Sequence, residues 1–535
     1  MTPTIAICSL IILVSAIRLL LRRGFSVLDN IPGPPRKSIL TGNLTQLRDP
    51  TESDYAFQRQ LEESYGEVVK MHGLLGERQL FVFDPVALHS ILIKDQDIWG
   101  MWEMLKWLNS LVFGKGILST SHADHRKYRK TMVPAFSTAN LREMLPIFYE
   151  VAEKTRYGLI SPNVVDSPQT LDFNSILGRT SLELIGRTGI GRSFDSMLPG
   201  QEADRYGNAL RALMPMAFKL HLAIPFLPLL GAIFPSSFRR FMINVIPLPT
   251  LHELRDAVDF TQETAGELVK DRKATINSGK RDANDGKDIM SLLVKGNMSA
   301  DTATHLTDEE LVACTAMIVF AATDTTSSAM NRMFHLLATY PEVQEKLRAE
   351  ILTASEQLNY DALVSLPYLD GVAREVLRLY PPVAPVAFRK ATSDTVLPLS
   401  EPITGVDGTL MHSISVPKGT SVYIAIAAAN HSKRIWGEDA LEFKPERWIN
   451  GKADSVTTKL PGVDGNTMTF IGGGRSCIGF KFAQLEMKVV AYVLLRAFRF
   501  LAADPRIKWL NTGIMPAPHV DDRPELPLLV ERLKV

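Results

Sequence analysis

A cysteine inside a glycine-rich loop is the residue of this chain best suited to chemistry. Cys477 lies in the run Phe470-Ile-Gly-Gly-Gly-Arg-Ser-Cys-Ile-Gly479, and an apolar pattern typical of a helix begins directly after it. Amide groups and the positive end of a helix favour a thiolate, which is a metal ligand. Gly473 and Gly479 permit positive φ and close approach of a large flat cofactor, and Arg475 suits a carboxylate. The pattern therefore predicts a loop that holds haem.

The same run resembles, at all five fixed positions, the haem-binding signature Phe-x-x-Gly-x-Arg-x-Cys-x-Gly of the cytochrome P450 family. This resemblance implies haem b (iron protoporphyrin IX) as the cofactor and Cys477 as the metal ligand. The other cofactor-binding residues of the signature are Phe470, Gly473, Arg475 and Gly479. The alternative is a small buried cysteine in a tight turn, and five matched positions favour the haem loop.

A long apolar segment carries the second candidate site. Thr307-Asp-Glu-Glu310 is a capping-box pattern that predicts the start of a helix, and the helical pattern continues to Tyr340-Pro341. Such a helix would be roughly 50 Å long. Its apolar stretch at 311–322 is too short to span a bilayer and is typical of a helix buried through the core.

Asp324, Thr325 and Thr326 interrupt the apolar face of this helix. A threonine inside a helix can bond the carbonyl four residues earlier and loosen the backbone ladder. The block 321–326 resembles the oxygen-activation motif of the family, which implies that Asp324 and Thr325 are catalytic and relay protons. Ala322 stands where the family usually has glycine, and its methyl group is expected to affect coupling. The alternative is a polar patch satisfied by a buried water.

Glu375 and Arg378 are three residues apart and share one face of a predicted helix. Leu377-Arg-Leu-Tyr-Pro-Pro382 ends that helix and resembles the Glu-x-x-Arg helix of the family. Pro445-Glu-Arg-Trp448 resembles the segment that supplies a second arginine, here Arg447. The resemblance implies a buried network of these three charged residues that is structural rather than catalytic.

A short basic helix contains residues that the resemblance places at the haem edge. His125 and Arg129 share one face and are similar to the family's propionate-binding pair, and Arg389 is similar to a further propionate ligand. The opposite face would form a basic patch that docks an acidic flavoprotein and is weakened by salt. This patch contains Arg126, Lys127 and Lys130. The alternative for each lysine is an ordinary solvated side chain.

Two apolar regions, 99–113 and 214–249, match the substrate-lid segments of the family, although each could be plain core. The stretch 222–230 could also dip into a membrane. We expect the substrate pocket to be lined by Trp107, Phe113, Met317, Phe320, Ala321, Val383 and Val386.

The N-terminus and the composition constrain where the protein works. Residues 5–21 are apolar and about long enough to span a bilayer, and the arginines that follow predict an uncleaved anchor with a cytosolic catalytic domain. We therefore expect a transmembrane anchor at 1–23, a proline-rich linker at 24–50 and a catalytic domain at 51–535. A net charge of +1 gives no argument for nucleic acid. Three cysteines fit a reducing compartment.

Helical patterns dominate the catalytic domain, and alternating segments at 68–83, 416–426 and the C-terminal tail predict small sheets. The fold class is mainly α with small β-sheets, and the resemblance implies the P450 fold, in which a long central helix crosses the haem.

That resemblance also implies a single-pass monooxygenase of the endoplasmic reticulum membrane that hydroxylates a hydrophobic molecule with O2. Its electrons would come from NADPH through a separate flavoprotein reductase, with cytochrome b5 as a further partner. A similarity to fungal secondary-metabolism members suggests a terpenoid substrate. The alternatives are a haem-thiolate isomerase or dehydratase that needs no NADPH, which the Asp324-Thr325 pair disfavours, and a non-catalytic haem-binding protein.

Overall fold

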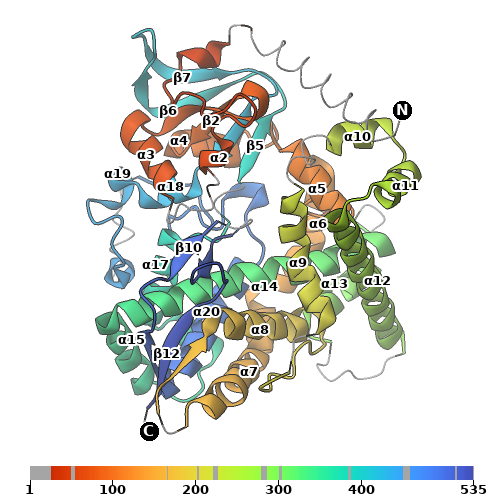
Figure 1. Ribbon diagram of the computed structural model, residues 1–535, viewed down its shortest axis with the longest axis vertical. Coiled ribbons are helices and arrows are strands. Elements are labelled where there is room, and N and C mark those ends of the chain that lie inside the picture. The colour runs from red at the N-terminus through yellow and green to blue at the C-terminus, as the bar shows by residue number, and fades with distance from the viewer. Residues whose placement is uncertain are drawn as a thin grey trace.

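The structure is a computed structural model (Figure 1). It describes residues 24, 26–47, 49, 55–165, 167–201, 204–220, 227–278, 286–299, 304–383, 387–449, 458–511 and 515–533. The predicted anchor at 1–23 and the stretch 222–226 lie outside the described residues.

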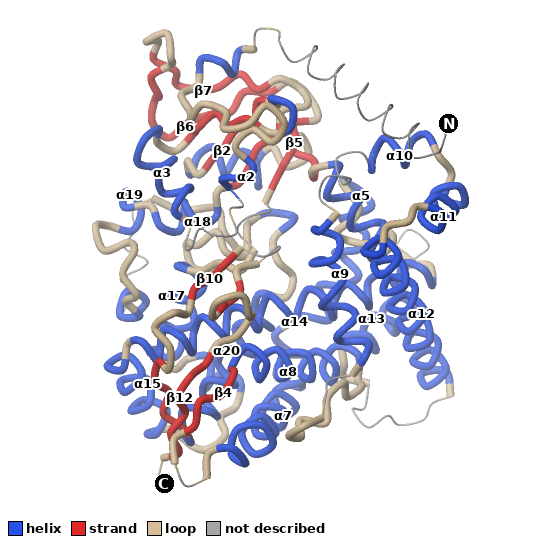
Figure 2. Tube along the Cα trace, viewed as in Figure 1, coloured by secondary structure: helices blue, strands red, loops and turns tan. Residues whose placement is uncertain are grey.

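A small sheet region forms the upper part of the molecule in Figure 2, where strands gather above the helices. Its five-stranded sheet has the order β1-β2-β8-β5-β3, in which β2 and β8 are parallel and the other pairs antiparallel. The strands are β1 (Val68–His72), β2 (Arg78–Val82), β3 (Trp99–Met101), β5 (Phe388–Ala391) and β8 (Ser421–Ile424), beside a hairpin of β6 (Thr395–Thr404) and β7 (Leu410–Val416). The region also contains α2 (Leu44–Leu47), α3 (Ala56–Tyr65), α4 (Pro85–His89), α18 (Ile426–His431) and α19 (Lys433–Trp436).

The segment predicted as a proline-rich linker packs against this sheet region. Leu28 and Ile31 are buried in its hydrophobic core, and the Lys70 amide donates to the Pro32 carbonyl at 2.9 Å. Arg78 forms an ion pair with Asp29. Residues 26–47 are therefore part of the folded body, and the division into anchor, linker and catalytic domain stays a prediction.

Helices form the larger part of the molecule and enclose a second hydrophobic core. They are α5 (Glu103–Phe113), α6 (His122–Met132), α7 (Thr138–Lys154), α8 (Phe173–Ile185), α9 (Arg205–Lys219), α10 (Leu227–Ile233), α11 (Ser236–Val245), α12 (Pro249–Asn277), α13 (Ile289–Met298), α14 (Asp308–Thr339), α15 (Pro341–Thr353), α16 (Tyr360–Val364), α17 (Pro367–Leu379) and α20 (Phe480–Ala497). The antiparallel sheet β4-β12-β9 borders them, with β4 (Gln169–Asp172), β9 (Phe498–Ala502) and β12 (Pro527–Arg532). A separate pair consists of β10 (Lys508–Leu510) and β11 (Ala517–His519). The mainly helical fold with small sheets is therefore confirmed.

Helix α14 runs through the middle of the molecule (Figure 1). Its 32 residues begin at a complete capping box, in which the Thr307 hydroxyl accepts from the Glu310 amide and the Glu310 carboxylate accepts from the Thr307 amide. The helix ends at Thr339, directly before Tyr340-Pro341. Within the described residues it is the one helix long and apolar enough to cross a membrane, but most of that stretch is buried inside the protein.

Two further helices carry predicted functional residues. Helix α17 bears Glu375 and Arg378 on a buried face and stops at Leu379, before the two prolines. Helix α20 begins at Phe480, three residues after Cys477, and most of its side chains are buried. Both helices contact α14. This arrangement fixes the cysteine loop against the central helix bundle.

Candidate active site

The loop before α20 contains glycines at which a Cβ would collide with other backbone atoms. Gly473 has a φ of +70°, and a Cβ there would lie 1.8 Å from the Leu92 carbonyl oxygen. Gly479 has a φ of −95° and so does not use the positive-φ freedom expected of it. The Cys477 amide donates to the Phe470 carbonyl at 2.9 Å, which closes the loop. The backbone around Cys477 is therefore tightly constrained.

The protein groups around Cys477 act on its pKa in opposite directions. Burial raises the pKa of the Cys477 thiol, while the Gly479 amide and the positive charge of Arg129 lower it. Burial has the largest effect of the three, so the thiolate expected from the loop stays a prediction. The residue is nevertheless exposed. A coordinated metal cation would remove the proton, because thiol ligands are deprotonated when they bind metal.

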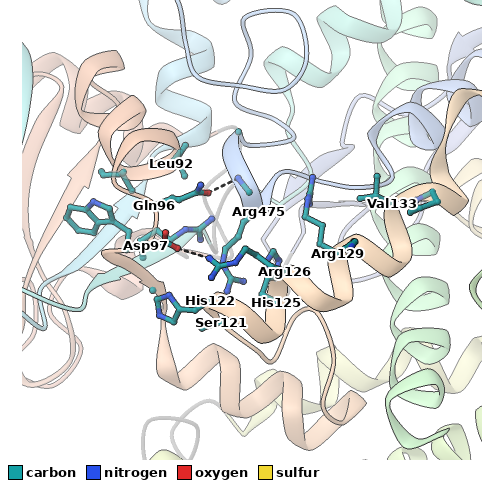
Figure 3. A pocket seen from close by; sticks show the side chains of 18 residues that line it. Leu92, Gln96, Asp97, Ser121, His122, His125, Arg126, Arg129, Val133 and Arg475 are labelled. Carbon is teal, nitrogen blue, oxygen red and sulfur yellow. Dashed lines mark hydrogen bonds and ion pairs between the residues drawn. The ribbon is translucent and has the colours of Figure 1, made fainter. Parts of the chain in front are cut away.

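A cavity of about 460 Å³ lies beside this loop. Figure 3 shows side chains that line it, which come from α6, the residues before β3, β5 and the cysteine loop. Four predicted cofactor-binding residues meet there, namely His125, Arg129, Arg389 and Arg475. Helix α6 supplies the first two, four residues apart, as the sequence pattern predicts.

The positive charges around this cavity are incompletely compensated. Arg389 and Arg475 donate to the carbonyls of Phe388 and Thr120, and neither forms an ion pair with a carboxylate among the described residues. Burial lowers the pKa of each guanidinium to about 10, and for Arg389 the charge of Arg475 adds to the effect. The acid in the lining, Asp97, is paired with Arg126 at 3.0 Å. Buried cations without partners are costly, so this cavity favours an anion.

His125 responds to the same positive field. Burial and the charges of Arg475, Arg129 and Arg389 lower its pKa to about 3. The imidazole is therefore neutral at physiological pH and can donate one hydrogen bond without adding charge. An anionic ligand in the cavity would reverse part of this shift.

Arg129 has a role that the sequence did not predict. Its guanidinium donates to the Ser476 carbonyl at 2.6 Å and to the Ser476 hydroxyl at 2.9 Å. It therefore braces the residue next to Cys477.

The predicted docking patch is smaller than the sequence suggests. Lys127 donates to Glu310 at 3.2 Å, while Lys130 is exposed.

The structure brings Glu375, Arg378 and Arg447 together. Arg378 makes two bonds to the Glu375 carboxylate, at 2.9 and 2.8 Å, and both side chains are fully buried. Arg447 donates to the same carboxylate at 3.3 Å. The network has two further members that the sequence did not predict. Trp448 donates its indole N–H to Glu375 at 2.9 Å, and Asp439 pairs with Arg447.

Asp324 in the middle of α14 has a partner on another helix. Arg211 of α9 donates through Nε to an Asp324 oxygen at 2.9 Å. Burial raises the pKa of Asp324 and Arg211 lowers it, with burial the larger effect. Gly178 of α8 provides room for the arginine, since a Cβ at Gly178 would lie 2.8 Å from a guanidinium nitrogen. Sequence could not reveal this pair, because Arg211 lies 113 residues away.

Thr325 follows the helical expectation. Its hydroxyl donates to the Ala321 carbonyl at 2.7 Å, four residues earlier. Ala321 is exposed although α14 is otherwise largely buried. The two residues therefore lie on an accessible stripe of a core helix, as a site for small molecules requires.

The residues predicted to line a substrate pocket occupy different surroundings. Phe113 and Phe320 form an aromatic contact with ring centroids 4.9 Å apart, whereas Met317 is buried in the core. Trp107 lies against α10, where a Cβ at Gly231 would be 2.2 Å from its ring. Val383 is half-buried, and Val386 lies outside the described residues. Direct contact with substrate stays a prediction for all of them.

The residues present fit a haem group. Haem carries two propionate carboxylates, and the cavity offers uncompensated Arg389 and Arg475 with a neutral His125. Cys477 is accessible and offers the soft sulfur that iron accepts. These residues would hold the propionates and the iron respectively.

Comparisons with known proteins agree with this chemistry. The family model described as Cytochrome P450 matches residues 32–516. Cytochrome P450 monooxygenase 91 of Postia placenta is 43% identical over 95% of this chain and 95% of its own length, and monooxygenase 81 of that fungus is 43% identical over 94% and 92%. A protein of Ganoderma lucidum named ganoderic acid synthetase is 39% identical over 95% and 94%. The chain therefore belongs to the cytochrome P450 family, and its enzyme class is that of the cytochrome P450 monooxygenases.

Proposed function

We propose that this protein is a membrane-anchored haem-thiolate monooxygenase that hydroxylates an apolar small molecule with O2 and electrons from NADPH. The observation that carries the proposal is the accessible Cys477 beside a cavity whose buried Arg389 and half-buried Arg475 lack a counter-anion. Haem, when bound, supplies the activation of O2 and the transfer of one oxygen atom.

The other residues are assigned to holding the cofactor in place. Cys477 binds the iron, and Arg389, Arg475 and His125 bind the propionates, while Arg129 keeps Ser476 and the cysteine loop in position. Phe470 supports this loop through its carbonyl bond to the Cys477 amide. The Glu375 network lies behind the loop and is assigned to structure.

Asp324 and Thr325 are assigned to proton delivery. Asp324 has a pKa raised by burial, so its carboxyl group can hold a proton more readily than an exposed aspartate. Thr325 directly follows Asp324, and its hydroxyl, which is bonded to the Ala321 carbonyl, could pass a proton on. The Arg211 pair opposes protonation and keeps the carboxylate in one place.

The substrate is proposed to be apolar and of terpenoid type. Phe320, which contacts Phe113, directly precedes the exposed Ala321 on α14, and apolar side chains of this kind favour apolar ligands. The relative from Ganoderma lucidum is named for ganoderic acid, a terpenoid. That relative supports the substrate class without fixing the substrate.

The membrane location and the partners are proposed from the sequence pattern. Residues 1–23 would anchor the chain in the endoplasmic reticulum with the catalytic domain in the cytosol. A flavoprotein reductase that carries NADPH-derived electrons would approach the exposed cations near Lys130, with cytochrome b5 as a second donor.

The decisive experiment expresses the full chain in microsomes with a reductase and compares all metabolites against Cys477→Ala. A new oxygenated product that requires both NADPH and O2 is the expected result. Turnover without NADPH would establish an isomerase or dehydratase instead. A fully haem-loaded protein that yields no product across a broad panel of lipids and terpenoids would indicate a non-catalytic haem protein.

A further inference from the structure

A fully buried asparagine connects the Glu375–Arg378 network to the cysteine loop. Asn430 is the last residue but one of helix α18, which packs against α17. Its side-chain amide nitrogen donates to the Arg378 carbonyl at 3.0 Å and to the Thr469 hydroxyl at 2.9 Å. Its side-chain oxygen accepts from the Met468 amide at 2.7 Å. The backbone carbonyl of Asn430 accepts from the Arg378 guanidinium at 2.7 Å.

These partners leave one orientation of the amide. A backbone N–H can only donate and a backbone carbonyl can only accept, so the oxygen must face Met468 and the nitrogen must face Arg378. Thr469 completes the arrangement, since its hydroxyl donates to the Leu377 carbonyl at 2.7 Å while it accepts from Asn430. Thr469 is half-buried and the other groups lie in the interior, where a lost partner would be costly.

The residues that Asn430 holds in place lie directly before the cysteine loop. Met468 and Thr469 precede Phe470, whose carbonyl accepts from the Cys477 amide. The Ile471 amide in turn donates to the Met468 carbonyl at 2.9 Å. A displacement of Met468 or Thr469 would therefore move the Phe470 carbonyl, to which the Cys477 amide is bonded.

We infer that Asn430 is a positioning residue for the haem-thiolate bond, which it controls by fixing Met468 and Thr469 against the Glu375–Arg378 helix. This inference rests on the proposed function of Cys477 as the iron ligand. Hydrogen bonds behind a metal ligand commonly change metal affinity by about 10–100-fold, although they touch no metal.

The chain offers a matched control in a second buried asparagine. Asn297 is 2% exposed and also bridges two segments, because it donates to the Leu306 carbonyl at 2.9 Å and accepts from the Leu306 amide at 2.6 Å. It lies one residue before the end of α13, and among the described residues its side chain bonds to Leu306 and not to the cysteine loop. Its loss should weaken the fold without moving Cys477.

The experiment uses the full-length, haem-loaded protein in membranes and compares Asn430→Leu with Asn297→Leu. Three quantities are measured: the melting temperature, the fraction of reduced, CO-treated protein that shows the absorption band of thiolate-ligated iron, and the rate at which haem passes to apomyoglobin. Both variants should lower the melting temperature. Only Asn430→Leu should lose most of the thiolate band and release haem about 10–100-fold faster.

A milder substitution at Thr469 tests the same inference if Asn430→Leu does not fold. Thr469→Val should reduce the thiolate fraction and speed haem release, and Thr469→Ser, which keeps the hydroxyl, should restore both. The inference is overturned if Asn430→Leu or, should that variant not fold, Thr469→Val keeps the wild-type band and release rate. It is equally overturned if Asn297→Leu changes them as much. A wild-type protein that lacks the band would overturn the proposed function itself.

Discussion

Two groups of buried arginines in this protein differ in where their countercharges come from. Arg378 and Arg447 donate to Glu375, Asp439 and backbone carbonyls, so their charges are balanced inside the chain. Arg389 and Arg475 each donate to a backbone carbonyl, and no described carboxylate neutralises them.

The difference separates structure from binding. A charge cluster that is complete without a ligand stabilises the fold and has little left to offer. A cluster that is incomplete stores unfavourable electrostatic energy, which a ligand of opposite charge releases. We therefore propose that the first group supports the cysteine loop and that the second receives the cofactor. Substitutions in the two groups should change stability in opposite directions.

The largest effect is expected in the complete cluster. Arg378→Met would leave the Glu375 carboxylate buried without its main partner, and we expect the free energy of unfolding to fall by about 3–5 kcal/mol. Urea denaturation of the haem-free protein measures this change. A loss below about 1 kcal/mol, the range of exposed pairs, would show that the network is not a structural unit.

The incomplete cluster should respond with the opposite sign. Arg389→Met removes a buried cation that has no countercharge, so the haem-free protein should be unchanged or more stable by about 1–4 kcal/mol. The same variant should retain haem about 10–100-fold less well. Urea denaturation and haem transfer to apomyoglobin measure the two effects. Lys390→Met on the same strand is the control, and equal behaviour of the two variants would remove the distinction between the clusters.

Arg211 represents an intermediate case, a partly exposed arginine with a single acidic partner. Arg211→Gln removes the cation that lowers the pKa of Asp324, so burial should raise that pKa further. A carboxyl group with a raised folded-state pKa loses stability as pH rises through that pKa, so the variant should lose about 1–3 kcal/mol at neutral pH and less below pH 3.8.

Unfolding curves at several pH values and the infrared carbonyl band of a protonated Asp324 check this prediction. Arg205→Gln, on the same helix but stacked over Phe260, is the matched control. A pH-independent loss would show that Arg211 acts by packing alone.

The smallest effect at neutral pH concerns the uncharged His125. Its folded-state pKa of about 3 lies below the ordinary 6.5, so the unfolded chain binds the extra proton between these values. Stability of the haem-free protein should fall as pH decreases from 6.5 towards 3, by at most about 1.4 kcal/mol per pH unit from this group. His125→Gln should flatten the curve, whereas His122→Gln at an exposed site should not. If stability depends on pH equally in His125→Gln and in the wild type, the positive charges around the cavity do not act on His125.

The sequence predicted those parts of the site that local patterns encode. The capping box at Thr307 and the proline after Tyr340 mark the limits of α14, because caps and breakers act within a few residues. The residues of the cysteine loop, of α6 and of the Glu-x-x-Arg helix were likewise named from short motifs. Each motif lies on one element, so its spacing is visible in the chain.

Contacts between distant elements were not predictable in this way. Arg211 meets Asp324, and Asn430 meets Thr469, only because helices pack, and no spacing in the sequence reports that packing. The effect of burial on the pKa of Cys477 was not predictable for a related reason. Loop amides and helix ends are visible in sequence, but the desolvation that outweighs them arises from tertiary burial.

The central claim is that Cys477 binds the iron of a haem whose propionates neutralise Arg389 and Arg475. The most direct test is the absorption spectrum of the reduced, CO-treated full-length protein in membranes, compared with that of Cys477→Ala. The account predicts the band of thiolate-ligated iron in the wild type and its complete loss in the variant. A wild-type protein without this band, or a variant that keeps it, would contradict the account.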